Sequence, residues 1–400
     1  MLTIIQPNPG RIEGGVLTID RKFHLGMQNY VREISVPILS IHPSMSPDFK
    51  IMDPVHVPLH ELGYDVLTLD ADRRGKLGPD DQSTLERKIA ESQLIYGGGF
   101  DAARIAHRLR VPYILTMEYD LKTQIVVAAS RVKNPVRRAV RAVRCGFSYT
   151  RHNIVDVIHA HSVHCNGYPI YDESRWLHSK RLLYLDSRMT AEMVIAEAAV
   201  RDRLASRPRR ALRLLYSGRY EPLKGSLDAV RVAIECLQRG LDVEMHCYGQ
   251  GSLRDAMRQL VAKTSYGERV HVHDAVPYPE LVELSRTFDI FVCCHIQNDP
   301  SCTYLESFGA GLPIVGYANR MWRRLCEESA GGYSCKIGNC REMADRIGDL
   351  DSSPSRLSDM SFRAREFALA HSFENEFKRR TDALNEALTE LKHPRAPYGQ

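Results

Sequence analysis

Two basic side chains lie close together in a loop that could hold an anion. The segment 217–225 reads SGRYEPLKG and carries Arg219 and Lys224 between a predicted strand, 212–217, and a predicted helix, 225–239. Arginine offers a planar fork of N–H donors and lysine a compact point charge, so the pair suits a diphosphate. The plain alternative is a solvated basic loop.

A second stretch, 289–317, could form a binding edge. Its sequence, DIFVCCHIQNDPSCTYLESFGAGLPIVGY, predicts a buried strand at 290–294, a polar loop at 295–301, a short helix carrying Glu306 and a strand from Pro313. Such apolar, β-branched runs are typical of a parallel sheet. Open α/β sheets bind ligands where strands end and helices begin, and a carboxylate there can hold hydroxyls beside a bound phosphate. Phosphate and hydroxyl recognition together indicate a nucleotide sugar.

The second half of the chain resembles a known family. The motifs SGRYEPLKG, YGQGS, VPYPELVELSRTFDIFV and YLESFGAGLPIVG occur in order over most of residues 212–317. Together they resemble the retaining nucleotide-sugar glycosyltransferases of the group 1, family 4 type, which have the GT-B fold. The first half resembles the family more loosely, and 121–190 hardly at all.

The resemblance implies an α/β protein with two Rossmann-like, doubly wound domains facing a central cleft. It implies sugar transfer from a UDP- or GDP-linked donor to an acceptor hydroxyl, with retention, without a metal and without a cofactor beyond the donor. A glycan, a lipid-linked glycan or a small molecule would be the acceptor, and the pathway would be polysaccharide or glycoconjugate biosynthesis. Nucleic acid is not an expected partner.

The resemblance also implies roles for single residues. Arg219 and Lys224 would act in catalysis by holding the donor diphosphate, and Glu306 would hold the ribose hydroxyls. The other residues expected around the donor are Gly14, Gly15, Gly218, Gly249, Gly251, Asn298, Asp299, Ser301 and Thr303.

Residue 298 departs from the family pattern. The family usually carries a second glutamate at this distance before the ribose-binding one, and this chain has Asn298 with Asp299 beside it. Asparagine can bond a sugar hydroxyl but carries no negative charge. A catalytically weak or inactive relative that binds a nucleotide sugar or a partner therefore stays open.

The segment YGQGSLR could also be read as part of a dinucleotide-binding fingerprint. Arg254 occupies the place of the third glycine, and the motif lies in the middle of the chain. An oxidoreductase is therefore disfavoured.

The first half shows the same alternation of strands and helices. A strand at 2–6 leads to the loop PNPGRIEGG and a helix expected from about Thr18. Gly14 and Gly15 match the family's N-terminal glycine loop, or they form a plain turn. A βαβ unit over 94–117 ends in Glu118-Tyr119-Asp120, and Glu118 and Asp120 are candidates for steering an acceptor hydroxyl. The alternative for these carboxylates is a solvated strand end.

A cluster of histidines follows an expected strand at 155–159 and precedes a helix expected near 190–205. The residues are His159, His161 and His164. Their spacing suits a strand, and no matching set of carboxylates or cysteines is nearby. A metal site, polar residues of an acceptor site and ordinary structural histidines are all open, with the last favoured.

The segment 131–144 is basic and contains no acid. An apolar stripe of Val132, Val136, Val140 and Val143 runs among its cations, which predicts a basic amphipathic helix that contacts a membrane surface. The alternative is a helix packed on the domain with a solvated face. The cations are Arg131, Lys133, Arg137, Arg138, Arg141 and Arg144.

Length and composition predict a two-domain globular protein. The chain has 400 residues, 44% of them hydrophobic, a net charge of +5 and ten cysteines without framework spacing. No apolar run is long enough to span a membrane, and the N-terminus lacks the features of a signal peptide. We expect reduced cysteines and a cytoplasmic protein, with a peripheral position at the inner membrane face as the second option. The expected domains are 1–206 for the acceptor and 207–372 for the donor, with 207–210 as linker and 373–400 as a helix crossing back.

Overall fold

The computed structural model describes residues 1–392 apart from 47, 48, 50, 52, 73, 74, 131, 133 and 207–209, and only the backbone of 130 and 150–153. The chain divides into two compact units. The first unit runs from Met1 to Tyr184 and resumes at Glu376, and the second runs from Leu185 to Asn375. The boundary thus falls after Tyr184, whereas the sequence suggested 206. Most of the expected linker, 207–209, lies outside the described residues.

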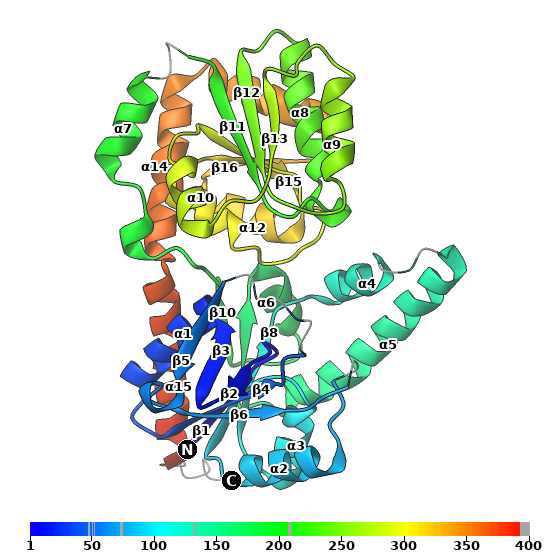
Figure 1. Ribbon diagram of the computed structural model, residues 1–400, viewed down its shortest axis with the longest axis vertical. Coiled ribbons are helices and arrows are strands. Elements are labelled where there is room, and N and C mark those ends of the chain that lie inside the picture. Colours follow the sequence, from blue (N-terminus) through cyan, green and yellow to red (C-terminus); the bar gives the residue numbers. More distant parts are fainter. Residues whose placement is uncertain are drawn as a thin grey trace. The chain divides into compact units, whose positions relative to one another are not determined.

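The first unit is built on a seven-stranded parallel sheet in the order β10-β9-β8-β7-β1-β4-β6 (Figure 1). Its strands are β1 (Leu2–Ile5), β4 (Ile38–Pro43), β6 (Asp65–Leu69), β7 (Leu94–Gly97), β8 (Tyr113–Met117), β9 (Ser162–Asn166) and β10 (Arg181–Tyr184). Helices α1 (Arg21–Glu33), α2 (Pro79–Ala90), α3 (Ala102–Leu109) and α6 (Tyr168–Ser174) lie between them in the chain. The strands are short, and β1, β4, β7 and β9 are buried over nearly all their length, as expected for parallel strands covered by helices.

A small antiparallel sheet was missed in the first half. The strands β2 (Arg11–Glu13), β3 (Val16–Asp20) and β5 (Pro54–Pro58) pair in the order β2-β3-β5. The helix expected from Thr18 is therefore wrong at its start, because Asp20 caps α1 and residues 16–20 are a strand. Gly14 and Gly15, with φ of 56° and 76°, form the exposed two-residue turn of the β2–β3 hairpin. Positive φ at both turn residues matches the twist of a hairpin.

A helical hairpin occupies the part of the first half that resembled the family least. It consists of α4 (Leu121–Ser130) and α5 (Pro135–Ile158). Asn134 caps α5, accepting a hydrogen bond from Arg137 N, and Pro135 fills its first turn. The strand expected at 155–159 is wrong, because α5 continues to Ile158. Periodicity alone cannot distinguish a short apolar run in a strand from one in a buried helix.

The second unit contains a six-stranded parallel sheet in the order β13-β12-β11-β14-β15-β16. Its strands are β11 (Leu212–Ser217), β12 (Val243–Tyr248), β13 (Val270–His273), β14 (Ile290–Cys293), β15 (Ile314–Tyr317) and β16 (Gly332–Cys335). The sequence predicted β11 with its observed ends. The two parallel sheets confirm the predicted α/β class.

Helices alternate with these strands. They are α8 (Ser226–Gln238), α9 (Arg254–Ala262), α10 (Tyr278–Ser285), α11 (Thr303–Gly309), α12 (Arg320–Ser329), α13 (Cys340–Asp351) and α14 (Pro354–Ala370). Where one helix was expected near 190–205, the chain forms a 3₁₀ turn, η2 (Ala191–Met193), and then α7 (Glu197–Ser206). Buried side chains of β11, β12, α8 and α13 form one continuous core.

The last helix, α15 (Phe373–Lys392), begins at the residue that the sequence predicted. From Glu376 onward it belongs to the first unit. The ring of Phe377 lies against Gly26 of α1, where an added Cβ would come within 2.5 Å of it. Glu390 pairs with Lys180 at 2.6 Å. These contacts explain why the C-terminal helix packs with the N-terminal half.

We predict that Gly225→Ala will destabilise the second unit by about 3 kcal/mol or more. Gly225 has a φ of +64°, and an added Cβ would lie 2.0 Å from the carbonyl oxygen of Cys294. The left-handed backbone alone costs about 1–2 kcal/mol for a residue with a side chain, and the clash adds to it. Gly240→Ala is the matched control, since its φ is +80° and its Cβ would meet nothing within 4 Å. Urea unfolding measures both changes, and equal losses would contradict the argument.

Candidate functional site

The basic loop leaves the carboxyl end of β11 and enters α8. The phenol of Tyr216, buried beneath the loop, donates to Arg219 O at 3.1 Å. Lys224 N donates to Glu221 O at 3.0 Å within the 3₁₀ turn η4 (Pro222–Lys224). Gly225 then reverses the chain into α8. The loop is thus a compact turn that the buried phenol of Tyr216 stabilises.

The loop after β12 braces the basic loop from the neighbouring strand. Gly218 N donates to Tyr248 O at 3.0 Å, and Tyr220 N donates to Gln250 O at 2.8 Å. A Cβ at Gly249 would lie 1.9 Å from Gly218 O, and one at Gly251 would lie 2.5 Å from Tyr220 O. Only glycine permits so close an approach of two backbones. The structure therefore brings Gly218, Gly249 and Gly251 together, as a donor site would need.

A buried ion pair joins the basic loop to the loop after β14. Lys224 Nζ donates to Asp299 Oδ2 at 2.6 Å, and the two residues are 7% and 8% exposed. Burial alone would raise the pKa of Asp299, but the ammonium of Lys224 outweighs it and holds the pKa below its usual range. Asp299 is therefore the residue that supplies negative charge beside Lys224.

Asn298 has a structural contact instead. Its side-chain oxygen accepts a hydrogen bond from Arg320 N at 2.9 Å, at the start of α12. The first N–H groups of a helix have no partner within the helix, so this contact satisfies one of them. The two neighbouring residues thus have different tasks, which the sequence alone left open.

His295 is a site residue that the sequence analysis missed. It is 1% exposed, and neither ring nitrogen has a hydrogen-bond partner. Burial lowers its pKa to about 3, helped by the nearby charge of Lys224, so the ring is neutral. A buried polar ring without partners is costly, and a bound ligand is one way to satisfy it. The signal that could have identified His295 from the sequence is its position directly after the predicted strand 290–294.

Glu306 lies on α11 and faces a partner that the sequence did not suggest. Arg188 donates to Glu306 Oε1 from Nε at 3.0 Å and from Nη2 at 2.7 Å, and its guanidinium stacks over Tyr278 at 4.0 Å. Burial alone would lower the pKa of Arg188, but the Glu306 carboxylate raises it above its usual value. These two contacts hold the carboxylate in place through Oε1, and no hydrogen bond or ion pair to Oε2 occurs among the described residues.

The cations and Glu306 share one edge of the sheet without touching each other. The strands β11 and β14 are parallel neighbours, so the loops that follow them lie at the same edge. No hydrogen bond or ion pair joins Glu306 to Arg219 or Lys224 among the described residues. Arg219 is exposed, whereas Lys224 is buried. Ser301 and Thr303, which were also expected here, bond each other at 3.1 Å before α11.

The expected residues of the first unit lie on two different features. Gly14 and Gly15 form the hairpin turn described above. Glu118 is exposed just beyond β8, at the carboxyl end of the sheet. Asp120 is 1% exposed and accepts a hydrogen bond from Thr123 N at 2.8 Å in the first turn of α4. Asp120 is therefore a helix cap, which leaves Glu118 as the accessible carboxylate.

The histidine cluster of the first half does not gather in one place. His159 ends α5, and its Nδ1 bonds Val155 O at 2.9 Å. His161 lies 3.1 Å from Glu390, and His164 is buried on β9 with a pKa lowered to about 3 by burial. These contacts favour structural histidines.

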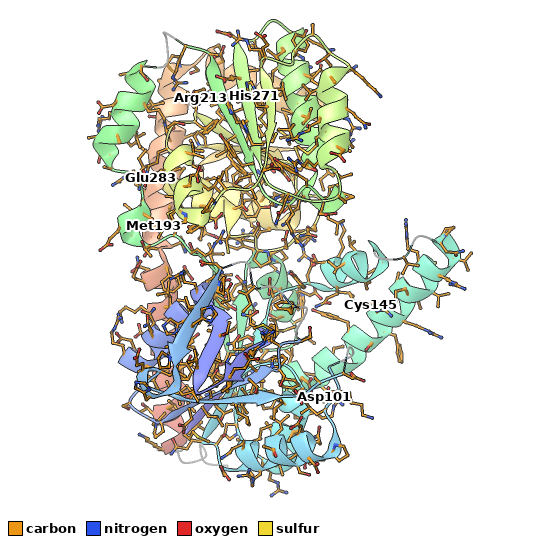
Figure 2. The ribbon with its side chains drawn as sticks, viewed as in Figure 1. Asp101, Cys145, Met193, Arg213, His271 and Glu283 are labelled. Atoms are coloured by element: carbon orange, nitrogen blue, oxygen red, sulfur yellow. The ribbon has the colours of Figure 1, made fainter. Side chains whose placement is uncertain are left out.

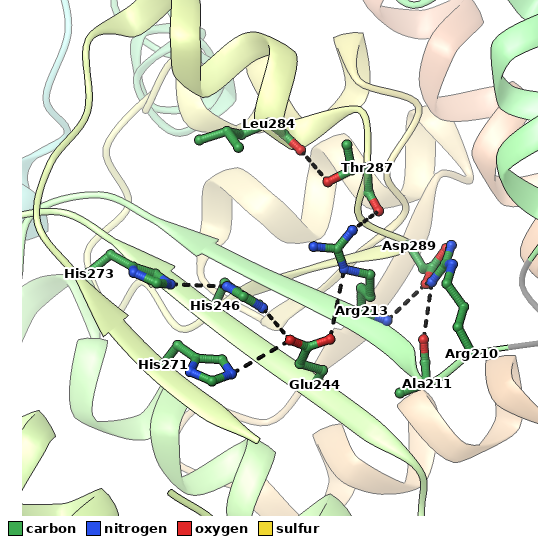
Figure 3. A network of polar contacts seen from close by, with 10 residues as sticks. All are labelled: Arg210, Ala211, Arg213, Glu244, His246, His271, His273, Leu284, Thr287 and Asp289. Atoms are coloured by element: carbon green, nitrogen blue, oxygen red, sulfur yellow. Dashed lines mark hydrogen bonds and ion pairs between the residues drawn. The ribbon is translucent and has the colours of Figure 1, made fainter. Parts of the chain in front are cut away.

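One group among the described residues has donor atoms arranged as a metal could use them: Glu244, His246 and His271, within 4.8 Å of one another. It lies on β12 and β13 (Figure 3). His246 bonds Glu244 at 2.8 Å, and the Arg213 guanidinium lies 4.0 Å from the same carboxylate. Because Arg213 balances this charge, the network is satisfied without an ion, and it joins neighbouring strands across the sheet face.

Comparisons with known proteins agree with this geometry. Residues 205–367 match the family described as glycosyl transferases group 1. The chain is 25% identical over 160 residues to a D-inositol 3-phosphate glycosyltransferase 1 of Catenulispora acidiphila, a match that spans 38% of each chain. Its fold is similar to HepE of Anabaena in complex with UDP (TM-score 0.65, 14% identity, 97% of this chain and 99% of HepE). It is also similar to sucrose-phosphate synthase of Thermosynechococcus elongatus (TM-score 0.64, 14% identity, 97% and 98%). The GT-B fold and the group 1 resemblance are thereby confirmed.

We predict that Asp299→Asn will destabilise the second unit by about 3–5 kcal/mol at neutral pH, because it leaves the buried Lys224 without its counter-charge. The double variant with Lys224→Met should cost less than the sum of the single changes. The folded pKa of Asp299 is lowered, so its contribution is present above the unfolded pKa of about 3.9 and is lost as pH falls through the folded value. The gap between wild type and variant should therefore narrow in acid.

The matched control is Asp349→Asn, which breaks the exposed pair of Asp349 with Arg346. Exposed pairs contribute about 0–1 kcal/mol. Urea unfolding across the pH range tests the set. A gap between wild type and Asp299→Asn that stays constant down to acid pH would contradict the assignment of the ion pair.

Proposed function

We propose that this chain is a glycosyltransferase, because residues 205–367 match the family described as glycosyl transferases group 1 and the chain shares the fold of HepE. It moves a sugar from a nucleoside diphosphate donor to an acceptor hydroxyl. The second unit binds the donor, and the first unit presents the acceptor. The observation that carries the proposal is the fixed Lys224 beside the exposed Arg219 at the carboxyl edge of the sheet.

The positive groups support a role in leaving-group departure. Breaking the bond at the anomeric carbon leaves negative charge on the diphosphate, and fixed cations aimed at that charge lower the barrier. Lys224 is held by Asp299 and needs no rearrangement. Arg219 has no ion-pair partner among the described residues, so its planar fork is available for two phosphate oxygens. The buried nitrogens of His295, on the loop after β14, could serve the same ligand.

Glu306 supports recognition of the ribose. Arg188 binds one carboxylate oxygen, which leaves the other to accept hydrogen bonds from the ribose hydroxyls. Arg188 thus acts as a positioning residue, since it keeps the carboxylate oriented. The contact to the transferred sugar that the family usually makes with a glutamate falls here to Asn298 or Asp299, and Asp299 is the one that carries charge.

Retention of configuration and independence of metal are part of the proposal. Arg219 and Lys224 supply the charge that a bound cation supplies in other enzymes. The departing phosphate takes the proton of the acceptor hydroxyl as the new bond forms. Glu118, exposed at the carboxyl end of the first sheet, steers the acceptor hydroxyl, and Gly14 and Gly15 approach the ligands from the hairpin turn. Whichever unit moves, closure would exclude water, because donor hydrolysis is the competing reaction.

The base of the donor is best assigned to uridine or guanosine, and the product to polysaccharide or glycoconjugate biosynthesis. HepE of Anabaena, whose fold this chain shares, has been solved with UDP-glucose. We also propose a peripheral position at the inner face of a membrane. No helix in the described part of the chain is long and apolar enough to cross one.

A nucleotide-sugar-binding protein without turnover is the second candidate. Asn298, in place of an acidic residue, is the observation that favours it. The two candidates share the donor site and differ only in catalysis, so one set of measurements separates them.

We predict that Arg219→Ala will lower kcat/KM for donor turnover about 100-fold, because the loss of one charge-stabilising donor typically costs about 2.7–4 kcal/mol of barrier. Release of the nucleoside diphosphate from UDP- and GDP-sugars, with and without EDTA, is the measurement. Arg341→Ala is the control, since its side chain is 82% exposed on α13. A thermal shift with UDP or GDP in wild type but no release supports the binding protein. Turnover unaffected by Arg219→Ala would refute the proposed site.

A further inference from the structure

One face of α5 exposes large apolar side chains to solvent. Val136, Val140, Val143 and Phe147 are 71%, 48%, 72% and 68% exposed. Their spacing of three and four residues places them on one stripe of the helix. Val132 was expected in this stripe but precedes the helix, and Phe147 extends the stripe instead. Contiguous exposed apolar side chains of this kind mark an interaction surface.

Arginines flank this stripe, and no acid balances them. Arg137, Arg138, Arg141 and Arg144 lie on the exposed part of α5. Residues 121–155 contain eight lysines and arginines and no aspartate or glutamate. Arg131 and Lys133 of the predicted basic segment lie outside the described residues. A helix with a cationic flank and an apolar stripe is the type that lies in the interface of an anionic bilayer.

The helix is one arm of a hairpin that leaves the body of the first unit (Figure 1). Side chains project into open space around Cys145, on the outer part of α5 (Figure 2). Gly146 of α5 faces Ile125 of α4, whose Cδ1 would be in ordinary contact, at 3.4 Å, with a Cβ added at Gly146. Tyr149 Oη donates to Tyr119 O at 3.2 Å and ties α5 to the start of α4. The apolar stripe therefore lies on a helix that is tied to the neighbouring arm of the hairpin.

A cavity of about 150 Å³ lies at the base of this hairpin. Its apolar lining comes from β8, α4, α5, α6 and the segment after α6: Met117, Leu121, Ile154, Val157, Ile170 and Leu177. The polar groups at its wall have partners in the protein, for Glu173 accepts from Leu121 N and Tyr149 donates to Tyr119 O. An apolar cavity of this volume can hold a group of about six carbon atoms. Met117, in its wall, directly precedes Glu118, the proposed acceptor carboxylate.

We propose that the α4–α5 hairpin docks on an anionic bilayer and that the cavity at its base takes the apolar chain of a membrane-borne acceptor. The inference rests on the proposed function for the reaction and deepens it by naming the acceptor class, a hydroxyl compound with an acyl or isoprenoid chain. Docking places the stripe among lipid chains and the arginines at the headgroups. A chain held beside Met117 brings the attached polar headgroup to Glu118.

The combination of features favours a bilayer over other partners. A nucleic acid would use the arginines but leave the valines and Phe147 in water. A second copy of this chain would cover the apolar stripe but would bring two sets of arginines together. An anionic bilayer satisfies both parts of the surface at once.

The first test is co-sedimentation of the full chain with vesicles of phosphatidylcholine alone or mixed with phosphatidylglycerol. We expect binding to the mixed vesicles only, weakened by salt. Arg137→Gln with Arg138→Gln and Arg141→Gln should lower partitioning about 100-fold, since each arginine contributes about one kcal/mol at an anionic surface. Val136→Ser with Val143→Ser and Phe147→Ser should also lower it. The control, Ile337→Ser with Arg341→Gln, changes an exposed apolar residue and an exposed arginine elsewhere and should bind as wild type.

The second test addresses the cavity. A thermal-shift titration compares farnesyl phosphate with inorganic phosphate, and we expect stabilisation by the former only. Leu177→Trp, which fills the cavity, should abolish that shift and leave the shift with UDP or GDP unchanged. The nucleotide shift reports on the donor site alone, so failure of this inference is distinguishable from failure of the proposed function.

Several outcomes would overturn the inference. They are equal binding to neutral and anionic vesicles, unchanged binding in either triple variant, or a shift with farnesyl phosphate that survives Leu177→Trp. Binding to duplex DNA without binding to vesicles would assign the surface to nucleic acid. A dimer that the serine variant converts to monomer, again without vesicle binding, would assign it to a second copy of this chain.

Discussion

The donor edge of the second unit depends on one buried ion pair. A charge taken out of water costs several kcal/mol unless an opposite charge meets it at hydrogen-bond distance. Lys224 and Asp299 meet at 2.6 Å because β11 and β14 are neighbours in the sheet, so the loops after them must approach. The strand order therefore determines whether the buried ammonium of Lys224 has a counter-charge. In turn, the pair joins the two loops at the edge of the sheet where we propose that the donor binds.

Around this pair, the site combines fixed and available groups. Backbone contacts at Gly249 and Gly251 lock the neighbouring loop against Tyr220 and Gly218, and Arg188 fixes the carboxylate of Glu306. Arg219 has no ion-pair partner and the ring nitrogens of His295 have no hydrogen-bond partner among the described contacts. Groups that are oriented before the reaction favour catalysis, because they need little rearrangement when negative charge develops on the leaving group. The uncompensated groups are the ones that a ligand would satisfy.

The first unit, in contrast, leaves apolar side chains exposed to solvent. Its sheet is buried on both faces, as parallel strands require, while the outer part of α5 exposes valines and a phenylalanine that folding leaves in water. The small antiparallel sheet and the cavity beneath the hairpin are likewise additions to the alternating pattern. The hairpin occupies the part of the chain that resembles the family least, where an acceptor-specific surface would differ between relatives.

The sequence by itself determined the elements whose signal is local. Strand 212–217 and the start of the last helix at Phe373 followed from apolar periodicity and from the residues that bound these elements. Local sequence patterns also indicated the α/β class, the basic loop and the short helix that carries Glu306. Local pattern failed at 155–158, where a short apolar run suits both a strand and a helix. It also failed at Thr18, where the chain forms a hairpin strand before the helix.

Only the tertiary structure decided which charges meet. Lys224 and Asp299 are 75 positions apart, and Arg188 and Glu306 are 118 apart. It also separated Asn298, which caps a helix, from its neighbour Asp299, and Asp120, which caps α4, from the accessible Glu118. Propensity and periodicity act over a few residues, whereas a partner across the sheet is set by strand order and burial. That is why the residue types of the site could be read from the chain and their pairing could not.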